Sequence, residues 1–281
     1  MRRTIALLIV ACLGGGSAHA EYGDRASTVP IDRHALVTRH NPVVRSVDPW
    51  SPLSVGNGGF AFTVDVTGLQ TFGDLYYTQG IPLETLGRWC WVQEENPDAY
   101  TLADASRDFV QTDGTTLSLP SLQSTEAGGW LRRNPRLHPL GQIALDWVKP
   151  DGSGFTPDDI VDPEQTLDLW TGVITSRFNL DGEPVTVITS CDPNSDTIGI
   201  RLQSSLVTRG ELRVRWRFPR GHDPAIKNTP PFDWSEPQNH HSTLTSPTTV
   251  KREVLGTTYF VSTSQTLTPD PASPHTFYLT G

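Results

Sequence analysis

The chain has 281 residues, a formal net charge of −9 and 19% charged residues. This length suits one large domain or two small ones, and it is enough to bury a core without disulfides or a structural metal. The acidic balance excludes the basic surface of a nucleic-acid-binding protein. The sequence contains a single short apolar run, which excludes a polytopic membrane protein.

Residues 1–20 have the pattern of a secretory signal peptide. A positive start at Arg2 and Arg3 precedes an apolar run, and Ala18-His19-Ala20 forms a small-residue cleavage site. The run is too short to span a membrane. The segment that ends at Cys12 also resembles a lipobox, so acylation of Cys12 is the alternative. We expect a secreted or periplasmic protein or, in the alternative, an outer-membrane lipoprotein.

Residues 21–49 form a polar lead-in, and strand patterns begin after Trp50. Apolar and polar residues alternate over 60–66 and again over 143–147. Asp181-Gly182 separates two β-rich runs, 173–180 and 184–189, which predicts a hairpin. Further β-rich runs predict strands over 198–202, 211–219, 259–264 and 276–280.

The strand at 211–219 has the clearest alternation. Apolar side chains at alternate positions predict a face in the core, and the arginines between them predict a face in water. We call this row of arginines the arginine ladder and expect it to form a solvated outer face. Its members are Arg213, Arg215 and Arg217.

Helical patterns are sparse. Short helices are predicted within 98–111 and 124–134, and irregular connections over 149–164 and 221–247. The prediction is an all-β fold, an antiparallel two-sheet sandwich with long loops and one or two short helices. It occupies residues 50–281. Because the last residues resemble the middle of a strand, we expect the domain to be truncated at its C-terminal end.

No spacing in the sequence identifies a catalytic centre. The acidic residues have no context that marks an acid–base pair, and no esterase GxSxG motif is present. His222, His240 and His241 are expected in a surface loop. We therefore predict no catalytic residue, no metal site and no cofactor. Cys90 and Cys191 form either one disulfide or two separate thiols.

Two stretches are candidates for binding a sugar. Trp50 and Asn57 belong to a glycine-rich segment, for which a tight turn is the alternative. Trp89 and Trp91 flank Cys90 near two glutamates; aromatic surfaces beside carboxylates suit sugar rings, and core packing is the alternative.

The order of several motifs resembles the N-terminal β-supersandwich of glycoside hydrolase families 95 and 65, and of bacterial six-hairpin glycosidases. These motifs are Trp50-x-x-Leu53-x-x-Gly56-Asn57-Gly58-x-x-Ala61, the stretch from Leu167 to Phe178 followed by Asp181-Gly182, and Trp130-Leu131-Arg132 ahead of Leu140-Gly141-Gln142-Ile143. The Leu-Pro of family 95 is Leu53-Ser54 here, and the Leu-Asn-Glu motif that follows it in that family is not recognisable after Thr71.

In those families an (α/α)6 barrel follows the sandwich and carries the general acid and base. The resemblance therefore implies a non-catalytic domain of a secreted carbohydrate-active enzyme, with carbohydrate and the barrel of the same full-length protein as partners. It implies that Trp50, Asn57, Trp89 and Trp91 border the barrel's sugar pocket. The alternatives are a stand-alone carbohydrate-binding domain and a mutarotase-like epimerase, which needs His138 or His222 beside a glutamate.

Overall fold

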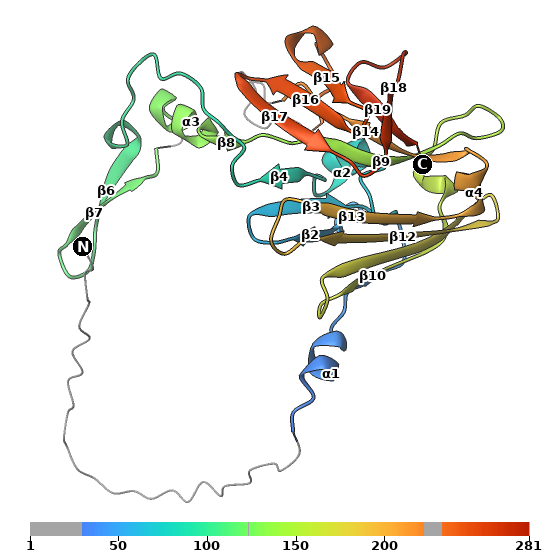
Figure 1. Cartoon of the computed structure of the whole chain (residues 1–281). Coiled ribbons are helices and arrows are strands. Elements are labelled where there is room, and N and C mark those ends of the chain that lie inside the picture. The colour runs from blue at the N-terminus through green and yellow to red at the C-terminus, as the bar shows by residue number, and fades with distance from the viewer. Residues whose placement is uncertain (1–29, 123, 222–231, 281) are drawn as a thin grey trace, which may run out of the picture. The chain divides into compact units, whose positions relative to one another are not determined.

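The computed structural model describes residues 30–122, 124–221 and 232–280. The chain divides into two units, residues 1–33 and 34–281, and every described strand belongs to the second. The predicted signal peptide, Cys12 and His222 lie outside the described residues. The prediction of an all-β fold is confirmed, because the sheets are antiparallel and the α-helices are short (Figure 1).

The largest sheet has five strands and contains the predicted hairpin. Asp181 and Gly182 both have positive φ, 48° and 79°, which is the conformation of a type I′ turn between two twisted strands. In spatial order the strands are β1 (Val43–Val44), β10 (Val161–Asp168), β11 (Val173–Leu180), β12 (Glu183–Cys191) and β13 (Ile198–Gln203).

Two strands of this sheet lie where the sequence predicted none. Strand β1 pairs Val43 with Thr166, so the sheet already begins within the predicted lead-in. Strand β10 begins inside the stretch 149–164, where we predicted an irregular connection. The prediction for that stretch is therefore wrong at its C-terminal end.

The second sheet has four strands. In spatial order they are β18 (Thr266–Pro269), β19 (Thr276–Thr280), β14 (Leu212–Arg217) and β9 (Gln142–Trp147). Strand β19 is an interior strand, since it pairs with β14 on one side and β18 on the other. The predicted strands over 143–147, 211–219 and 276–280 are confirmed.

Smaller sheets complete the fold. Strand β15 (His241–Ser246) lies within 221–247, where we predicted irregular structure. The three-stranded sheets are β2 (Leu53–Gly56), β3 (Phe60–Val64) and β4 (Thr85–Gly87), and β15 (His241–Ser246), β16 (Thr249–Val254) and β17 (Thr257–Ser262). The two-stranded ones are β5 (Trp91–Val92) with β8 (Arg136–Leu137), and β6 (Ser106–Val110) with β7 (Thr116–Pro120).

The described residues form more helices than the one or two predicted. The helix predicted over 98–111 is wrong, because this segment contains one 3-10 turn and strand β6. The helix predicted over 124–134 is confirmed as α3 (Glu126–Arg133). The α-helices are α1 (Arg33–Thr38), α2 (Gly73–Gln79), α3 (Glu126–Arg133) and α4 (Ser205–Thr208); the 3-10 turns are η1 (Ala103–Ala105), η2 (Pro157–Asp159) and η3 (Pro237–Asn239).

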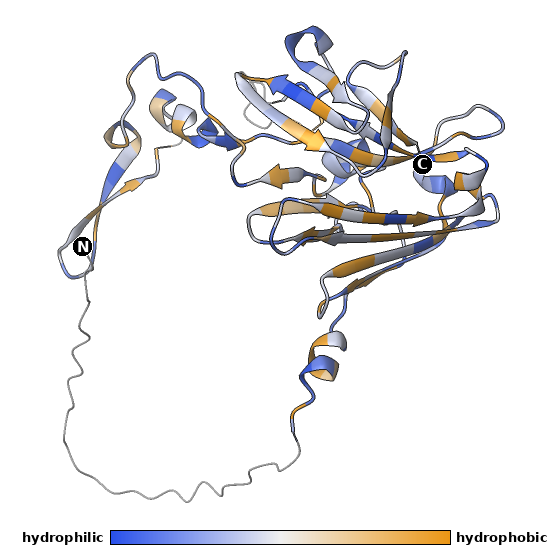
Figure 2. Cartoon of the chain, viewed as in Figure 1, coloured by the Kyte–Doolittle hydropathy of each residue, from blue (hydrophilic) through white to orange (hydrophobic). Residues whose placement is uncertain are grey.

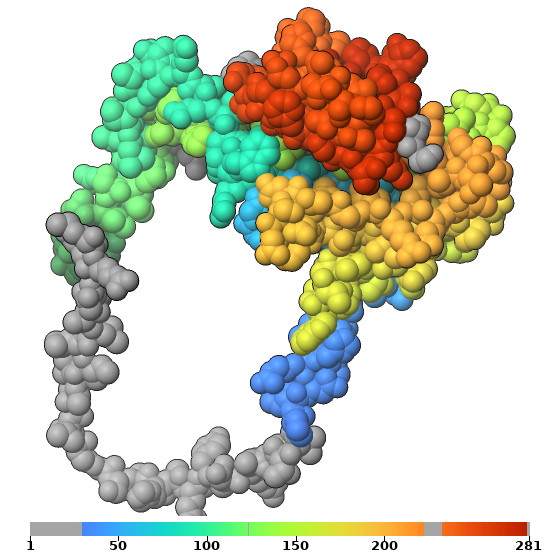
Figure 3. Space-filling view, viewed as in Figure 1, coloured from blue at the N-terminus to red at the C-terminus, as the bar shows by residue number. Residues whose placement is uncertain are grey.

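The two largest sheets share one core. Phe178 and Val187 of the five-stranded sheet pack in the same cluster as Ile143 and Leu145 of the four-stranded sheet. Figure 2 shows hydrophobic residues alternating with hydrophilic ones along these strands, as burial of one sheet face requires. In Figure 3 the orange and red atoms of the C-terminal strands lie against the gold atoms of β12 and β13.

Candidate functional site

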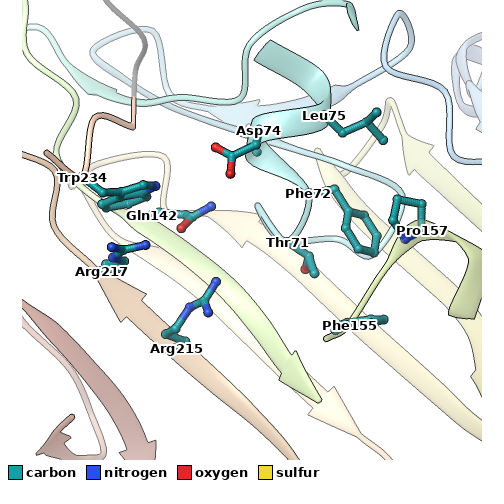
Figure 4. Close-up of a pocket in the computed structure, with 11 residues that line it drawn as sticks. Thr71, Phe72, Asp74, Leu75, Gln142, Phe155, Pro157, Arg215, Arg217 and Trp234 are labelled. Atoms are coloured by element: carbon teal, nitrogen blue, oxygen red, sulfur yellow. The ribbon is translucent and has the colours of Figure 1, made fainter. Parts of the chain in front are cut away.

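A cavity of about 230 Å³ opens on the face of the four-stranded sheet that carries the arginine ladder. Its lining comes from the segment that leads into α2, from strands β9 and β14, from the segment around η2, and from Trp234 (Figure 4). The lining residues are Thr71, Phe72, Gly73, Asp74, Leu75, Gln142, Phe155, Pro157, Arg215, Arg217 and Trp234.

The segment before α2 is fixed to the edge of β9. The backbone N–H of Gln70 donates to the carbonyl of Ile143 at 2.8 Å, and the N–H of Ile143 donates back to Gln70 Oε1 at 3.1 Å. The N–H of Leu145 donates to the hydroxyl of Thr71 at 3.2 Å. These bonds hold Thr71 and Phe72 beside the sheet, so the position of this wall is set by the fold.

Arg217 and Trp234 form one side of the cavity. The guanidinium of Arg217 lies 3.8 Å from the centre of the Trp234 ring, and Phe232 stacks on Trp234 at 5.7 Å between centroids. Burial and the neighbouring charge of Arg215 lower the pKa of Arg217. The prediction of a fully solvated ladder is therefore wrong at Arg217, because the segment around Trp234 covers this end of the face.

The other two arginines of the ladder both lie close to the carboxylate of Asp146. The guanidinium of Arg213 forms an ion pair with Asp146 and lies 3.9 Å from the centre of the Tyr278 ring. Arg215 lies 3.9 Å from the other oxygen of Asp146. The Nε atoms of Arg215 and Arg217 are buried and have no hydrogen-bond partner in the described part of the chain.

The opposite side of the cavity is apolar. Phe72 contacts Phe155 edge to face at 5.3 Å, and Leu75 and Pro157 complete this wall. Asp74 lies in the first turn of α2 and is exposed, so its carboxylate is accessible at the rim. The cavity thus places two cations, a carboxylate and the amide of Gln142 opposite hydrocarbon surface (Figure 4).

The four residues that the sequence proposed for sugar binding lie outside this lining. Asn57 is a structural residue of its turn: its Nδ2 donates to the carbonyls of Asp192 and Ser195, and its Oδ1 accepts from the N–H groups of Gly59 and Phe60. These bonds use the hydrogen-bonding capacity of the amide. Trp50 is 69% exposed.

Trp89 and Asn57 both form hydrogen bonds with the connection between β12 and β13. The indole N–H of Trp89 donates to Asp196 at 2.6 Å, and its ring meets the edge of Tyr259 at 5.9 Å. Trp89 and Trp91 are both about half exposed. Only Trp91 belongs to a strand, β5, and Trp89 lies outside that strand.

The histidines divide between surface and core. His241 is exposed as predicted, although it begins strand β15 and does not lie in a loop. His240 is buried, so the prediction of a surface position is wrong for it. Arg252, itself fully buried, donates to His240 Nδ1 at 2.9 Å. Because a guanidinium has no acceptor, Nδ1 carries no proton here. Burial, followed by the charge of Arg252, lowers the pKa of His240 to about 3.

Other candidate chemistry is dispersed. Cys90 and Cys191 are free thiols, Cys90 buried and Cys191 partly exposed. His138, named for an epimerase, is buried edge-on to Tyr259 and lies outside the cavity lining. Within the described ranges, no group of three or more His, Cys, Asp or Glu residues could hold a metal ion.

Comparison with known proteins gives no assignment: no protein-family model matches the chain, and no curated protein matches it. Among the helices of residues 30–122, 124–221 and 232–280, none is both long enough and apolar enough to cross a membrane.

Proposed function

We propose that this chain is a non-catalytic carbohydrate-binding sandwich domain of a secreted carbohydrate-active enzyme, and that the cavity beside Arg217 binds a sugar. The observation that carries the proposal is the composition of this cavity. A sugar ring presents hydroxyl groups around its edge and C–H groups on its faces. The lining offers charged and amide groups on one side and Phe72, Phe155 and Pro157 on the other, which matches both kinds of surface.

The size of the cavity supports a small ligand. Its volume of about 230 Å³ lies below the roughly 300–1,000 Å³ of sites for drug-sized ligands. One monosaccharide, or the terminal unit of a longer glycan, is therefore the proposed occupant.

The chemistry of the lining favours binding over hydrolysis. Glycosidases need two carboxyl groups about 5–9.5 Å apart, and Asp74 is the one carboxylate among the lining residues. We assign the general acid and base to an (α/α)6 barrel of the same full-length protein, against which the sandwich would pack, as the resemblance in sequence suggests.

Calorimetric titration of the chain with a panel of monosaccharides and their oligomers tests the proposal. We expect binding that is weakened by Asp74→Asn and Phe155→Ala and kept in Asp108→Asn, which alters an exposed aspartate on β6. Absence of binding across the panel would overturn the proposal. Weakening by Trp89→Ala and Trp91→Ala, with Asp74→Asn silent, would move the site to the surface that the sequence analysis named.

A further inference from the structure

We infer that the cavity selects a sugar unit that carries a carboxylate, a hexuronate, and that Arg215 and Arg217 together bind this carboxylate. The inference rests on the proposed function, since it names the class of sugar for the same cavity.

The two guanidiniums belong to alternate residues of β14. Their backbone positions are separated by two residues, roughly 6.6 Å along a strand, and both side chains project from the same sheet face. Both line the cavity, with Gln142 beside them on β9 (Figure 4). A ligand carboxylate between them can accept from both, and the planar fork of a guanidinium matches carboxylate geometry.

The donors of the pair are largely uncommitted. Arg217 has no hydrogen bond or ion pair with the described residues, and its guanidinium lies over the face of Trp234. Arg215 approaches Asp146 Oδ1 at 3.9 Å, which is an ion-pair distance but too long for a hydrogen bond. A ligand with two adjacent acceptor oxygens would therefore satisfy donors that the fold leaves unpaired.

Trp234 fixes Arg217 in place for this task. One ring face supports the guanidinium at 3.8 Å and the indole also stacks with Phe232 at an interplanar angle of 11°. An arginine that is already ordered loses less conformational entropy when it binds a ligand. Trp234 is thus a positioning residue for Arg217, and the apolar wall at Phe155 is left for the sugar face.

The local charge favours a ligand with one negative charge. The lining has two guanidiniums and one carboxylate, Asp74, inside a chain whose formal net charge is −9. One anionic group on the ligand would balance the one positive charge that remains after Asp74 offsets one of the two guanidiniums. A dianionic phosphate would exceed this balance and would meet repulsion from Asp74, whereas a hexuronate places hydroxyl groups within reach of that acceptor.

The test is calorimetric titration with matched pairs, glucuronate against glucose and galacturonate against galactose, at low and at high salt. We expect at least one uronate to bind roughly tenfold or more tightly than its neutral partner, a difference of about 1.4 kcal/mol. The preference should shrink at high salt, since screening weakens partly exposed charge interactions. Glucose 6-phosphate and acetate are the probes for a phosphate and for a carboxylate without a sugar.

Substitutions of the two arginines test whether they cause the preference for a uronate over a neutral sugar. Arg215→Gln and Arg217→Gln should each reduce the affinity for the uronate by a larger factor than the affinity for its neutral partner, so that the tenfold preference falls to about twofold or less. Arg177→Gln, on an exposed position of β11, is the matched control and should change neither. If Arg217→Gln does not fold, Arg217→Lys keeps the charge without the fork, and Arg215→Gln tests the other half of the pair.

The outcomes separate the two proposals. Equal affinity for uronate and neutral sugar overturns this inference and leaves the proposed function standing. Tighter binding of glucose 6-phosphate overturns the choice of a monoanion, and acetate binding as tight as uronate binding overturns the requirement for a sugar. If no sugar of either kind binds, both proposals fail.

Discussion

The carboxylate of Asp65 accepts a hydrogen bond of 2.8 Å from the backbone N–H of Phe72, seven residues later in the chain. Its other oxygen accepts from the N–H and the hydroxyl of Thr67, at 2.8 and 2.6 Å. Asp65 is completely buried. The hydrogen bonds of this one buried carboxylate therefore stabilise the turn after β3 and position Thr71 and Phe72 in the cavity wall.

This relationship predicts the effect of Asp65→Asn. An amide has one acceptor oxygen, so its NH2 group would face either Thr67 or the Phe72 N–H. We expect the free energy of unfolding to fall by about 1–3 kcal/mol, the cost of leaving a buried polar group unsatisfied. Urea denaturation measures this change. Asp108→Asn is the control, and equal stability of the two variants would contradict a structural role for Asp65.

Asp65 and His240 should give opposite pH dependences. Burial raises the pKa of Asp65 to about 6 from an ordinary 3.8, so its contribution to stability is full below pH 3.8 and is lost as the pH rises through 6. Burial and Arg252 lower the pKa of His240 to about 3 from 6.5. Its contribution is full above pH 6.5 and is lost as the pH falls toward 3.

The two effects oppose each other between pH 4 and 6 in the native chain, so single variants should reveal them. We expect Asp65→Asn to lose stability as the pH falls from 6.5, with a slope of up to about 1.4 kcal/mol per pH unit. His240→Gln, whose Oε1 can still accept from Arg252, should instead gain stability from pH 6 to pH 4. Denaturation at several pH values checks both slopes; parallel profiles for the two variants would contradict the assignment.

Gly80 is the C-terminal neighbour of α2, and its missing side chain permits a close backbone contact. A Cβ atom at this position would lie 2.1 Å from the carbonyl oxygen of Pro49, which also accepts from the N–H of Ile81. We expect Gly80→Ala to destabilise the chain by about 1–3 kcal/mol or more, since the backbone must move. Gly154→Ala is the control, because a Cβ at Gly154 meets nothing within 4 Å and the backbone there is outside the left-handed region. Equal thermal midpoints for both variants would contradict this role.

The sequence predicted strands well where one face is buried and the other is not. Strands β3, β11 and β14 alternate clearly, and Asp181-Gly182 set the hairpin. Strands β10 and β15 were missed because their residues are mostly polar, and pairing with a neighbouring strand determines them. The helix expected over 98–111 failed because pairing with β7 overrides a weak local preference.

The cavity could not be found from spacing. Its charged residues come from α2 and β14, more than 130 positions apart, and Trp234 joins them from a further connection. The arginine ladder was visible, but an alternating strand does not show what covers its polar face. A tryptophan soon after a strand of arginines is a weak signal that the face is partly covered.

Asn57, which the resemblance in sequence implied for sugar binding, has a structural role. Its amide joins the turn before β3 to the connection between β12 and β13 through Asp192 and Ser195. We expect Asn57→Ala to lower the free energy of unfolding by about 1–3 kcal/mol and to leave sugar affinity unchanged, because the cavity is lined by other residues. Denaturation and calorimetry on the same preparation separate the two roles. Lost affinity at unchanged stability would instead make Asn57 a ligand contact and place the sugar at the Trp89 surface.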